Sequence, residues 1–228
     1  MPHNAWNNER IDGPLGILGG TFDPVHFGHL RLAEEARRGL ALAEVRWIPA
    51  GQPAHRAAPK ASAIQRVDMV RLAIHGNPGF ALDDSEALGA GPSYSVPTLE
   101  RLRVQIGPRR PMVLLLGSDA FLALSTWHRW RELFGLAHVA VAARPNYRLT
   151  GDTMEAALAD EFHARHAASA AAIAEGPAGR IVPFGIAALD ISATALRAEI
   201  ATGHGARYLL PDPVLDYIAA NRLYNHPE

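Results

Sequence analysis

Short apolar runs alternate with longer amphipathic segments along most of the chain. Consecutive apolar residues predict buried strands, whereas apolar positions three to four residues apart predict helices. The predicted strands are residues 15–18, 45–48, 80–82, 113–116, 139–142 and 181–182. Helical spacing is found within residues 30–40, 64–74, 99–102, 191–200 and 213–223. Strands that alternate with helices favour βαβ units and a parallel sheet.

Three segments lack this alternation. Residues 1–14 are polar and predict a flexible N-terminal tail. Residues 50–61 are rich in Pro, Ala and Gly and predict a long loop, and the Ala-rich residues 153–175 predict a weakly patterned helix at the periphery. Because no linker divides the rest, we predict one α/β domain over residues 15–228 that ends in a C-terminal helical extension.

The amino-acid composition excludes several kinds of functional site. The 228 residues include no cysteine, which excludes disulfides, thiolate nucleophiles and Cys-ligated metals. The formal net charge is −1, so nothing draws the whole chain to nucleic acid or to an anionic membrane. No leader or membrane-spanning run is visible, and we expect a cytoplasmic protein. Lys60 is the only lysine, so phosphate binding must depend on Arg, His and backbone amides.

The segment richest in candidate ligand-binding residues is GGTFDPVHFGHL, residues 19–30, which lies between a predicted strand and a predicted helix. Gly19 and Gly20 permit a tight turn and a close approach by a ligand. His26 and His29 can share one face at the helix start, where anions are favoured. On these residues alone, two incidental histidines after a glycine turn remain as plausible as a phosphate site. Zinc is a weaker alternative, because no third ligand lies nearby.

A second segment, ISATALR at residues 191–197, also begins a predicted helix. The hydroxyls of Ser192 and Thr194, the free amides of the first turn and the guanidinium of Arg197 can all bind phosphate oxygens. Taken alone, the segment also fits an N-capped helix with a solvated arginine.

The two segments, in this order, resemble the H-x-G-H and S-x-x-x-x-R signatures of the adenylyltransferases in the nucleotidyltransferase superfamily. The resemblance runs from about Leu15 to Tyr224 and implies a Rossmann-like, doubly wound parallel sheet. It also implies that His26, His29 and Arg197 are catalytic, since they would hold the triphosphate of ATP. The residues that it implies for ATP binding are Gly19, Gly20, Thr21, Phe22, His26, Gly28, His29, Gly117, Asp119, Ile191, Ser192, Thr194 and Arg197.

Three further segments resemble the nicotinate-nucleotide branch of this superfamily. Gly117-Ser118-Asp119 and Trp127-His128 follow a central strand, and the resemblance places Asp119 near the ribose of ATP and Trp127 against the nicotinate ring. Trp127 fits a packed core residue equally well. His128 stands where some relatives have Tyr.

The other two segments are SYSVPTL, residues 93–99, and PAGQPAHR, residues 49–56. The first resembles S-Y-T-x-x-T-L, and implies that Ser95 and Thr98 receive the nicotinate carboxylate. Ser95 replaces the usual Thr, and Pro97 has no amide hydrogen to donate. The second implies that His55 and Arg56 approach the substrate phosphate, although both also fit solvated loop charges.

The resemblance therefore predicts transfer of the adenylyl group of ATP to nicotinate mononucleotide in NAD biosynthesis. It predicts Mg²⁺ as cofactor with ATP, but names no metal ligand in the chain. Nicotinamide mononucleotide or phosphopantetheine as substrate, and a non-catalytic nucleotide sensor, remain alternatives. A nucleic-acid-binding role is disfavoured by the charge and the chain length. We expect a monomer or a small homo-oligomer with no membrane partner.

Overall fold

The computed structural model describes residues 13–53, 58–143, 150–187 and 189–225. Its centre is a six-stranded sheet in which every pairing is parallel. The strand order is β4-β2-β1-β6-β7-β8. These strands are β1 (Leu15–Gly20), β2 (Glu44–Pro49), β4 (Phe80–Leu82), β6 (Met112–Gly117), β7 (His138–Ala143) and β8 (Ile181–Gly185). The predicted strands and the doubly wound parallel sheet are confirmed.

The order of the strands reverses between β1 and β6. β1 pairs with β2 on one side and with β6 on the other, with Leu15 opposite both Glu44 and Met112. The crevice outside the carboxyl ends of two such strands is where open α/β sheets bind ligands. Gly20 ends β1 and Gly117 ends β6, so the predicted phosphate segment and the predicted adenosine segment begin at this point.

Alternate residues of each central strand pack into two separate cores. In β6, Val113 and Leu115 enter one core, whereas Leu114 and Leu116 enter the other. This alternation explains why the strands are apolar throughout, since a sheet with helices on both faces buries both sets of side chains.

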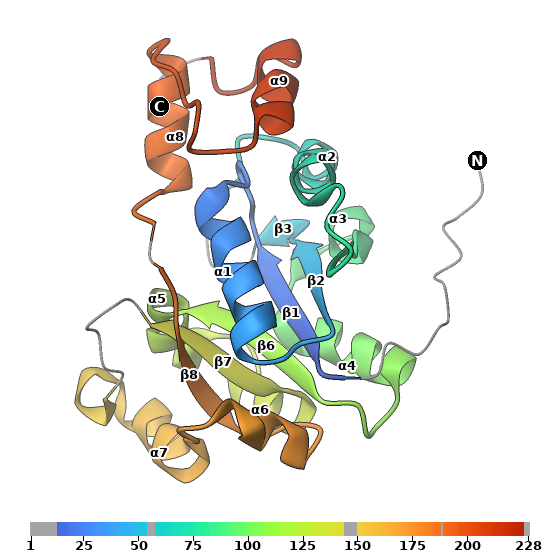
Figure 1. Cartoon of the computed structure of the whole chain (residues 1–228), viewed down its shortest axis with the longest axis vertical. Helices are drawn as coiled ribbons and strands as arrows, with labels where there is room; N and C mark the ends of the chain where they lie inside the picture. The colour runs from blue at the N-terminus through green and yellow to red at the C-terminus, as the bar shows by residue number, and fades with distance from the viewer. Residues whose placement is uncertain (1–12, 54–57, 144–149, 188, 226–228) are drawn as a thin grey trace.

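Each core is covered by its own helices (Figure 1). The first core takes side chains from α1 (Phe27–Gly39), α2 (Ala63–Ile74), α8 (Ala193–Ala201) and α9 (Asp212–Ala220). The second takes side chains from α4 (Ser95–Ile106), α5 (Ser118–Leu122), α6 (Leu133–Leu136) and α7 (Ala156–Arg165). The smaller elements are β3 (Gln52–Pro53), α3 (Ser85–Leu88), β5 (Pro92–Ser93) and the 3-10 turns η1 (Leu124–Thr126), η2 (Trp130–Glu132), η3 (Gly151–Thr153) and η4 (Ala170–Glu175).

The Ala-rich stretch differs from its prediction. It is not one peripheral helix but the sequence η3, α7 and η4, and it supplies core residues. Leu158 and Phe162 are buried in the second core and Ile173 in the first. The stretch links β7 to β8, and a crossover of this kind must lie against the sheet that it spans. Its few large apolar residues are the ones that enter the cores.

The C-terminal extension consists of α8 and α9, which lie beside α1 and α2 at one end of the molecule (Figure 1). The hydroxyl of Tyr217 on α9 donates to Asp68 on α2 at 3.1 Å. Val214 and Ile218 are buried, as their helical spacing predicts. No helix in the described part of the chain is long and apolar enough to cross a membrane.

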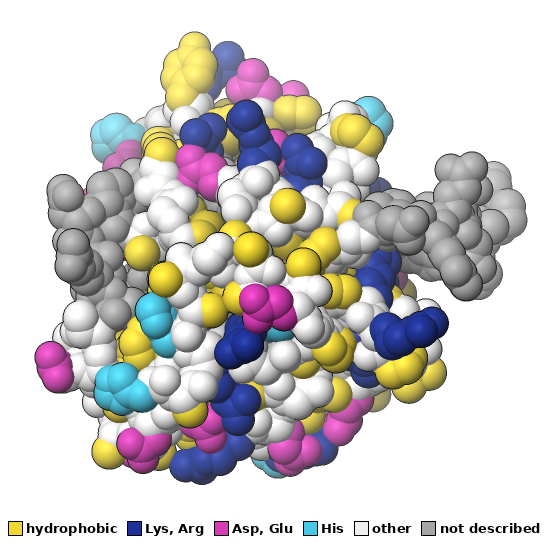
Figure 2. All heavy atoms as spheres, turned by 60° about the horizontal axis from the view of Figure 1, so that its bottom comes forward, with side chains coloured by type: hydrophobic (Ala, Val, Ile, Leu, Met, Phe, Trp, Pro, Cys, Tyr) yellow, Lys and Arg dark blue, Asp and Glu magenta, His cyan; other side chains and the backbone are white. Residues whose placement is uncertain are grey.

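Most of the predicted N-terminal tail, residues 1–12, lies outside the described residues. On the face shown in Figure 2, acidic and basic side chains lie beside one another rather than in separate patches.

Candidate active site

The turn after β1 brings the two histidines of the first signature together. His26 is the N-cap of α1, and His29 lies in the helix's first turn. Their rings stack, with centroids 3.8 Å apart and planes inclined by 29°. A Cβ added at Gly28 would be 3.0 Å from the His26 ring. A side chain at Gly28, which directly precedes His29, would therefore crowd the His26 ring.

Burial and hydrogen bonding determine the protonation of this pair. The backbone N–H of His26 donates to Nδ1 of His29 at 3.3 Å, so the neutral His29 ring carries its proton on Nε2. Burial lowers the pKa of His26 to about 4, which makes its imidazole neutral at pH 7. Within the described residues, the buried Nδ1 of His26 has no hydrogen-bond partner. A buried ring nitrogen without a partner costs free energy and is unusual in folded proteins. This one lies at a helix N-terminus, where anions bind readily.

The second signature reaches the same turn from the other end of the chain. Ser192 caps α8 by accepting from the backbone N–H of Ala195 at 3.1 Å. Arg197, one turn further on, donates through Nη1 to the carbonyl oxygen of Asp23 at 2.9 Å. Its Nη2 contacts the hydroxyl of Thr194 at 3.4 Å. The two predicted phosphate-binding segments therefore lie side by side in the fold.

Asp23 has a larger role in this turn than its sequence context indicated. Its carboxylate is buried and accepts from the backbone N–H groups of Lys60 and Ala61 at 2.7 and 3.1 Å. The hydroxyl of Tyr224, near the end of the chain, donates to the same carboxylate at 2.7 Å. This pair fastens the C-terminal segment to the turn between β1 and α1.

Arg66 is a further residue that the sequence analysis missed. Its side chain is 1% exposed and donates to four carbonyl oxygens. Those of Thr21, Ala50 and Gly51 are at 2.8, 2.6 and 2.8 Å, and that of Ala61 is at 3.3 Å. Burial lowers its pKa, but the guanidinium stays charged because arginine starts so far above neutral pH. Arg66 thus joins the loops that follow β1 and β2.

The carboxyl end of β6 carries the predicted adenosine segment. Gly117 is the N-cap of α5, and Asp119 lies exposed in the first turn of that helix. A Cβ added at Gly19 or at Gly117 would meet no heavy atom of the described chain within 4 Å. Packing among those residues therefore does not require either glycine, which leaves space for a ligand at both strand ends.

The predicted nicotinate residues lie around the start of α4, on the opposite face of the sheet from α1. Trp127 is half-buried against the second core, and His128 is exposed. The His128 ring contacts the ring of Tyr94, the N-cap of α4, with centroids 4.7 Å apart. Ser95 occupies the first turn of α4.

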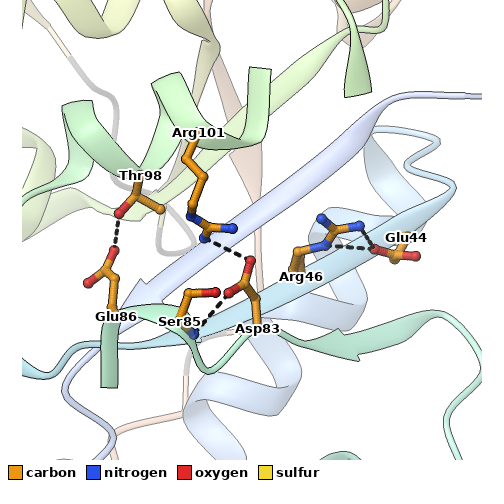
Figure 3. Close-up of polar contacts among 7 residues, drawn as sticks. All are labelled: Glu44, Arg46, Asp83, Ser85, Glu86, Thr98 and Arg101. Carbon is orange, nitrogen blue, oxygen red and sulfur yellow. Dashed lines mark hydrogen bonds and ion pairs between the residues drawn. The ribbon is translucent and has the colours of Figure 1, made fainter. Parts of the chain in front are cut away.

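Thr98 is less available than expected. Its side chain is 8% exposed, and its hydroxyl donates to Oε1 of Glu86 on α3 at 2.5 Å (Figure 3). A hydroxyl has one proton to donate, so this contact occupies the donor that the resemblance assigns to the nicotinate carboxylate. His55 and Arg56 lie outside the described residues, and their assignment stays a prediction.

Comparison with known proteins agrees with this arrangement. A family model described as cytidylyltransferase-like matches residues 17–199. The chain is 54% identical over 213 residues to the "Probable nicotinate-nucleotide adenylyltransferase" of Dechloromonas aromatica, covering 93% of this chain and 98% of that one. It is 47% identical over 210 residues to the protein of the same name from Laribacter hongkongensis, covering 92% and 94% of the two chains.

Solved structures share the fold at much lower identity. The nicotinic acid mononucleotide adenylyltransferase of Plasmodium falciparum, complexed with NaAD, superposes with a TM-score of 0.70 at 14% identity. The alignment covers 94% of this chain and 98% of that one. From the near-complete coverage and the high identity to curated relatives, we conclude that this chain belongs to the cytidylyltransferase-like family and, within it, to the nicotinate-nucleotide adenylyltransferases.

Proposed function

We propose that this protein transfers the adenylyl group of ATP to nicotinate mononucleotide, forming nicotinate adenine dinucleotide and pyrophosphate. The observation that carries the proposal is the meeting of the two signatures at one turn. The stacked rings of His26 and His29 lie at the N-terminus of α1, and Arg197 reaches the same turn from α8. The N-terminus of a helix and a guanidinium are thus brought to one turn. Both bind phosphate oxygens, as a site for a triphosphate requires.

The reaction needs no covalent intermediate on the protein. An oxygen of the mononucleotide 5′-phosphate attacks the α-phosphorus of ATP, and the bond from that phosphorus to the bridging oxygen breaks. Pyrophosphate takes the bonding electron pair as it leaves. Because the nucleophile is already an anion, catalysis consists mainly of positioning and charge stabilisation. That agrees with a chain that has no cysteine.

Each residue of the turn has a definite part in this scheme. Nε2–H of His29 and the neutral ring of His26 donate to phosphate oxygens, and both lie beside the N-terminal amides of α1. Arg197 binds the β- and γ-phosphates and stabilises the charge that develops on pyrophosphate. Gly19 and Gly117 leave room for the nucleotide between β1 and β6.

Mg²⁺ belongs to this scheme as part of the substrate, bound to ATP. No group of three or more His, Cys, Asp or Glu side chains among the described residues is arranged to hold a metal ion. Mg²⁺ keeps several waters and is commonly bound through substrate phosphates with few protein ligands. The residues present therefore fit an ion that is carried by ATP rather than one held in a protein cage.

The mononucleotide fits the other side of the crevice. Trp127 and His128 provide ring surfaces, and the start of α4 provides Ser95 and free backbone amides for the nicotinate carboxylate. A site built for a carboxylate discriminates strongly against the neutral amide, because the buried donors would be left unmatched.

Pyrophosphate release is the measurement that tests this function. The purified chain is incubated with Mg–ATP and, in parallel, with nicotinate mononucleotide, nicotinamide mononucleotide or phosphopantetheine. We expect rapid release of pyrophosphate only in the incubation that contains nicotinate mononucleotide. Equal rates with both mononucleotides would refute the specificity, and release with phosphopantetheine alone would refute the substrate class. Binding of ATP without any release would indicate a nucleotide sensor.

A further inference from the structure

Two acidic residues after β4 hold one face of α4 (Figure 3). Asp83 is buried, and its Oδ2 accepts from Nη2 of Arg101 at 2.9 Å. Glu86, three residues later, accepts from the hydroxyl of Thr98, which lies three residues before Arg101 on α4. Residues three apart share a helix face, so the two contacts form a matched pair along α4, with Glu86 nearer to the N-terminal end.

The contact of Glu86 lies where three loops meet. The hydroxyl of Ser93 on β5 accepts from the backbone N–H of Gly51 at 2.9 Å, and β3 pairs with β5 beside it. A Cβ on Gly51 would be only 2.3 Å from the carbonyl oxygen of Glu86. The carbonyl oxygen of Gly51 also accepts from Nη2 of Arg66 at 2.8 Å. Glu86 is therefore packed directly against the loop that Arg66 joins to Thr21.

The end of α4 that Glu86 holds is the end that carries the mononucleotide residues. Tyr94 caps the helix and contacts His128, and Ser95 begins the first turn. Thr98 lies one turn further on and is fixed through its side chain to Glu86. A movement of this turn would move Tyr94 and Ser95 together. The more distant pair of Asp83 and Arg101 holds the middle of the helix instead.

We propose that Glu86 is a positioning residue for the mononucleotide: by accepting from Thr98, it fixes the N-terminal turn of α4 against His128. This inference rests on the proposed function, because it assumes that the start of α4 borders the mononucleotide. Glu86 itself does not touch the substrate. Burial raises its pKa, while the contacts with Thr98 and Ser93 oppose that rise. Because its partner on Thr98 is an uncharged hydroxyl, a neutral acceptor can replace the carboxylate.

The test measures the KM for nicotinate mononucleotide and the KM for ATP separately in each variant. In Glu86→Ala we expect the KM for nicotinate mononucleotide to rise about tenfold, the change produced by losing one well-made contact, and the KM for ATP to stay within about twofold. Glu86→Gln keeps an acceptor oxygen and is expected to restore most of the lost affinity. Thr98→Val removes the donor but leaves the contact of Glu86 with Ser93, so it is expected to raise the same KM by at most as much as Glu86→Ala. The double variant is expected to show no further loss beyond Glu86→Ala.

Arg101→Met is the matched control. It removes the neighbouring contact on the same helix face, so the melting temperature is expected to fall while both Michaelis constants hold. The inference is overturned if Glu86→Ala leaves the KM for the mononucleotide unchanged or raises both constants equally. It is also overturned if Arg101→Met shifts the mononucleotide constant as strongly. If Glu86→Ala does not fold, Thr98→Val decides by the same criteria. Absence of pyrophosphate release in the unaltered protein would instead contradict the proposed function.

Discussion

Arg197 donates through Nη1 to the backbone carbonyl oxygen of Asp23 at 2.9 Å, across a separation of 174 residues. The contact joins α8 to the turn between β1 and α1, the turn that leads into the histidine pair. Nη1 is held by the Asp23 carbonyl and Nη2 contacts the hydroxyl of Thr194, so both ends of the fork are positioned. The arginine is thus oriented by the protein before any nucleotide arrives, which reduces the ordering cost of binding.

The first prediction concerns the shape of that side chain. Arg197→Lys keeps the charge but loses the planar fork, so one ammonium must serve both the carbonyl of Asp23 and the phosphates. We expect kcat/KM for ATP to fall about tenfold or more in Arg197→Lys and further in Arg197→Met, a loss of at least about 1.4 kcal/mol. Steady-state release of pyrophosphate measures it. An Arg197→Lys variant with unaltered kcat/KM would show that the fork is not needed.

The second prediction concerns His29. Its Nε2–H is directed by the hydrogen bond that Nδ1 accepts from the backbone of His26. His29→Ala is expected to lose about 2–4 kcal/mol of transition-state stabilisation, as when one charge-stabilising donor is removed. Turnover under saturating substrates measures the loss. His75→Ala alters an exposed histidine far along the chain and serves as the control. Near-normal turnover in His29→Ala would contradict the role.

Local pattern predicted much of this site. The strands could be found because a sheet with helices on both faces needs apolar runs, and β1 and β6 have them. The helix starts were visible because His26 and Ser192 each follow a turn and precede helical spacing. The meeting of the two signatures came from the resemblance, since neither segment contains information about the other.

The contacts that hold the site together were not visible in the sequence. Arg66 has partners 16 and 45 residues away, so its helical context shows only an arginine among apolar neighbours. Tyr224 and Asp23 are 201 residues apart. Glu86 looks like an ordinary surface residue until the fold places it against Thr98, whose predicted role did not include this contact. Such pairs arise from tertiary packing, which hydrophobic periodicity does not record.

The third prediction concerns Arg66. Arg66→Met removes donors from the carbonyl oxygens of Thr21, Ala50 and Gly51, in a place that water reaches poorly. We expect the free energy of unfolding to fall by at least about 3 kcal/mol, since each unsatisfied buried group costs about 1–3 kcal/mol. Urea denaturation measures it. Arg71→Met is the control: Arg71 lies exposed on the same helix and pairs with Asp68, and surface pairs contribute about 0–1 kcal/mol. Equal losses of unfolding free energy in Arg66→Met and Arg71→Met would argue against a stabilising role for the buried contacts of Arg66.

The fourth prediction concerns pH and rests on His138, which is buried at the start of β7. Its Nδ1 accepts from the backbone N–H of Arg180 at 3.1 Å, so the neutral ring donates from Nε2 to the carbonyl oxygen of Gly176 at 2.9 Å. Burial lowers the pKa of His138, and it lowers that of His26 to about 4. Between the unfolded value of about 6.5 and these folded values, the unfolded chain binds more protons, so acid favours unfolding.

The free energy of unfolding is therefore expected to be steady near neutral pH and to fall as the pH drops below about 6.5, by up to about 1.4 kcal/mol per pH unit for each such histidine. His138→Asn keeps an acceptor near the position of Nδ1 but cannot take up the proton. It is expected to be less stable at pH 7 and to lose stability less steeply between pH 7 and pH 5, with His26 supplying part of the remaining slope. Urea denaturation at pH 7, 6 and 5 compares the two proteins. Identical slopes would show that His138 is already protonated in the fold or exposed to solvent there.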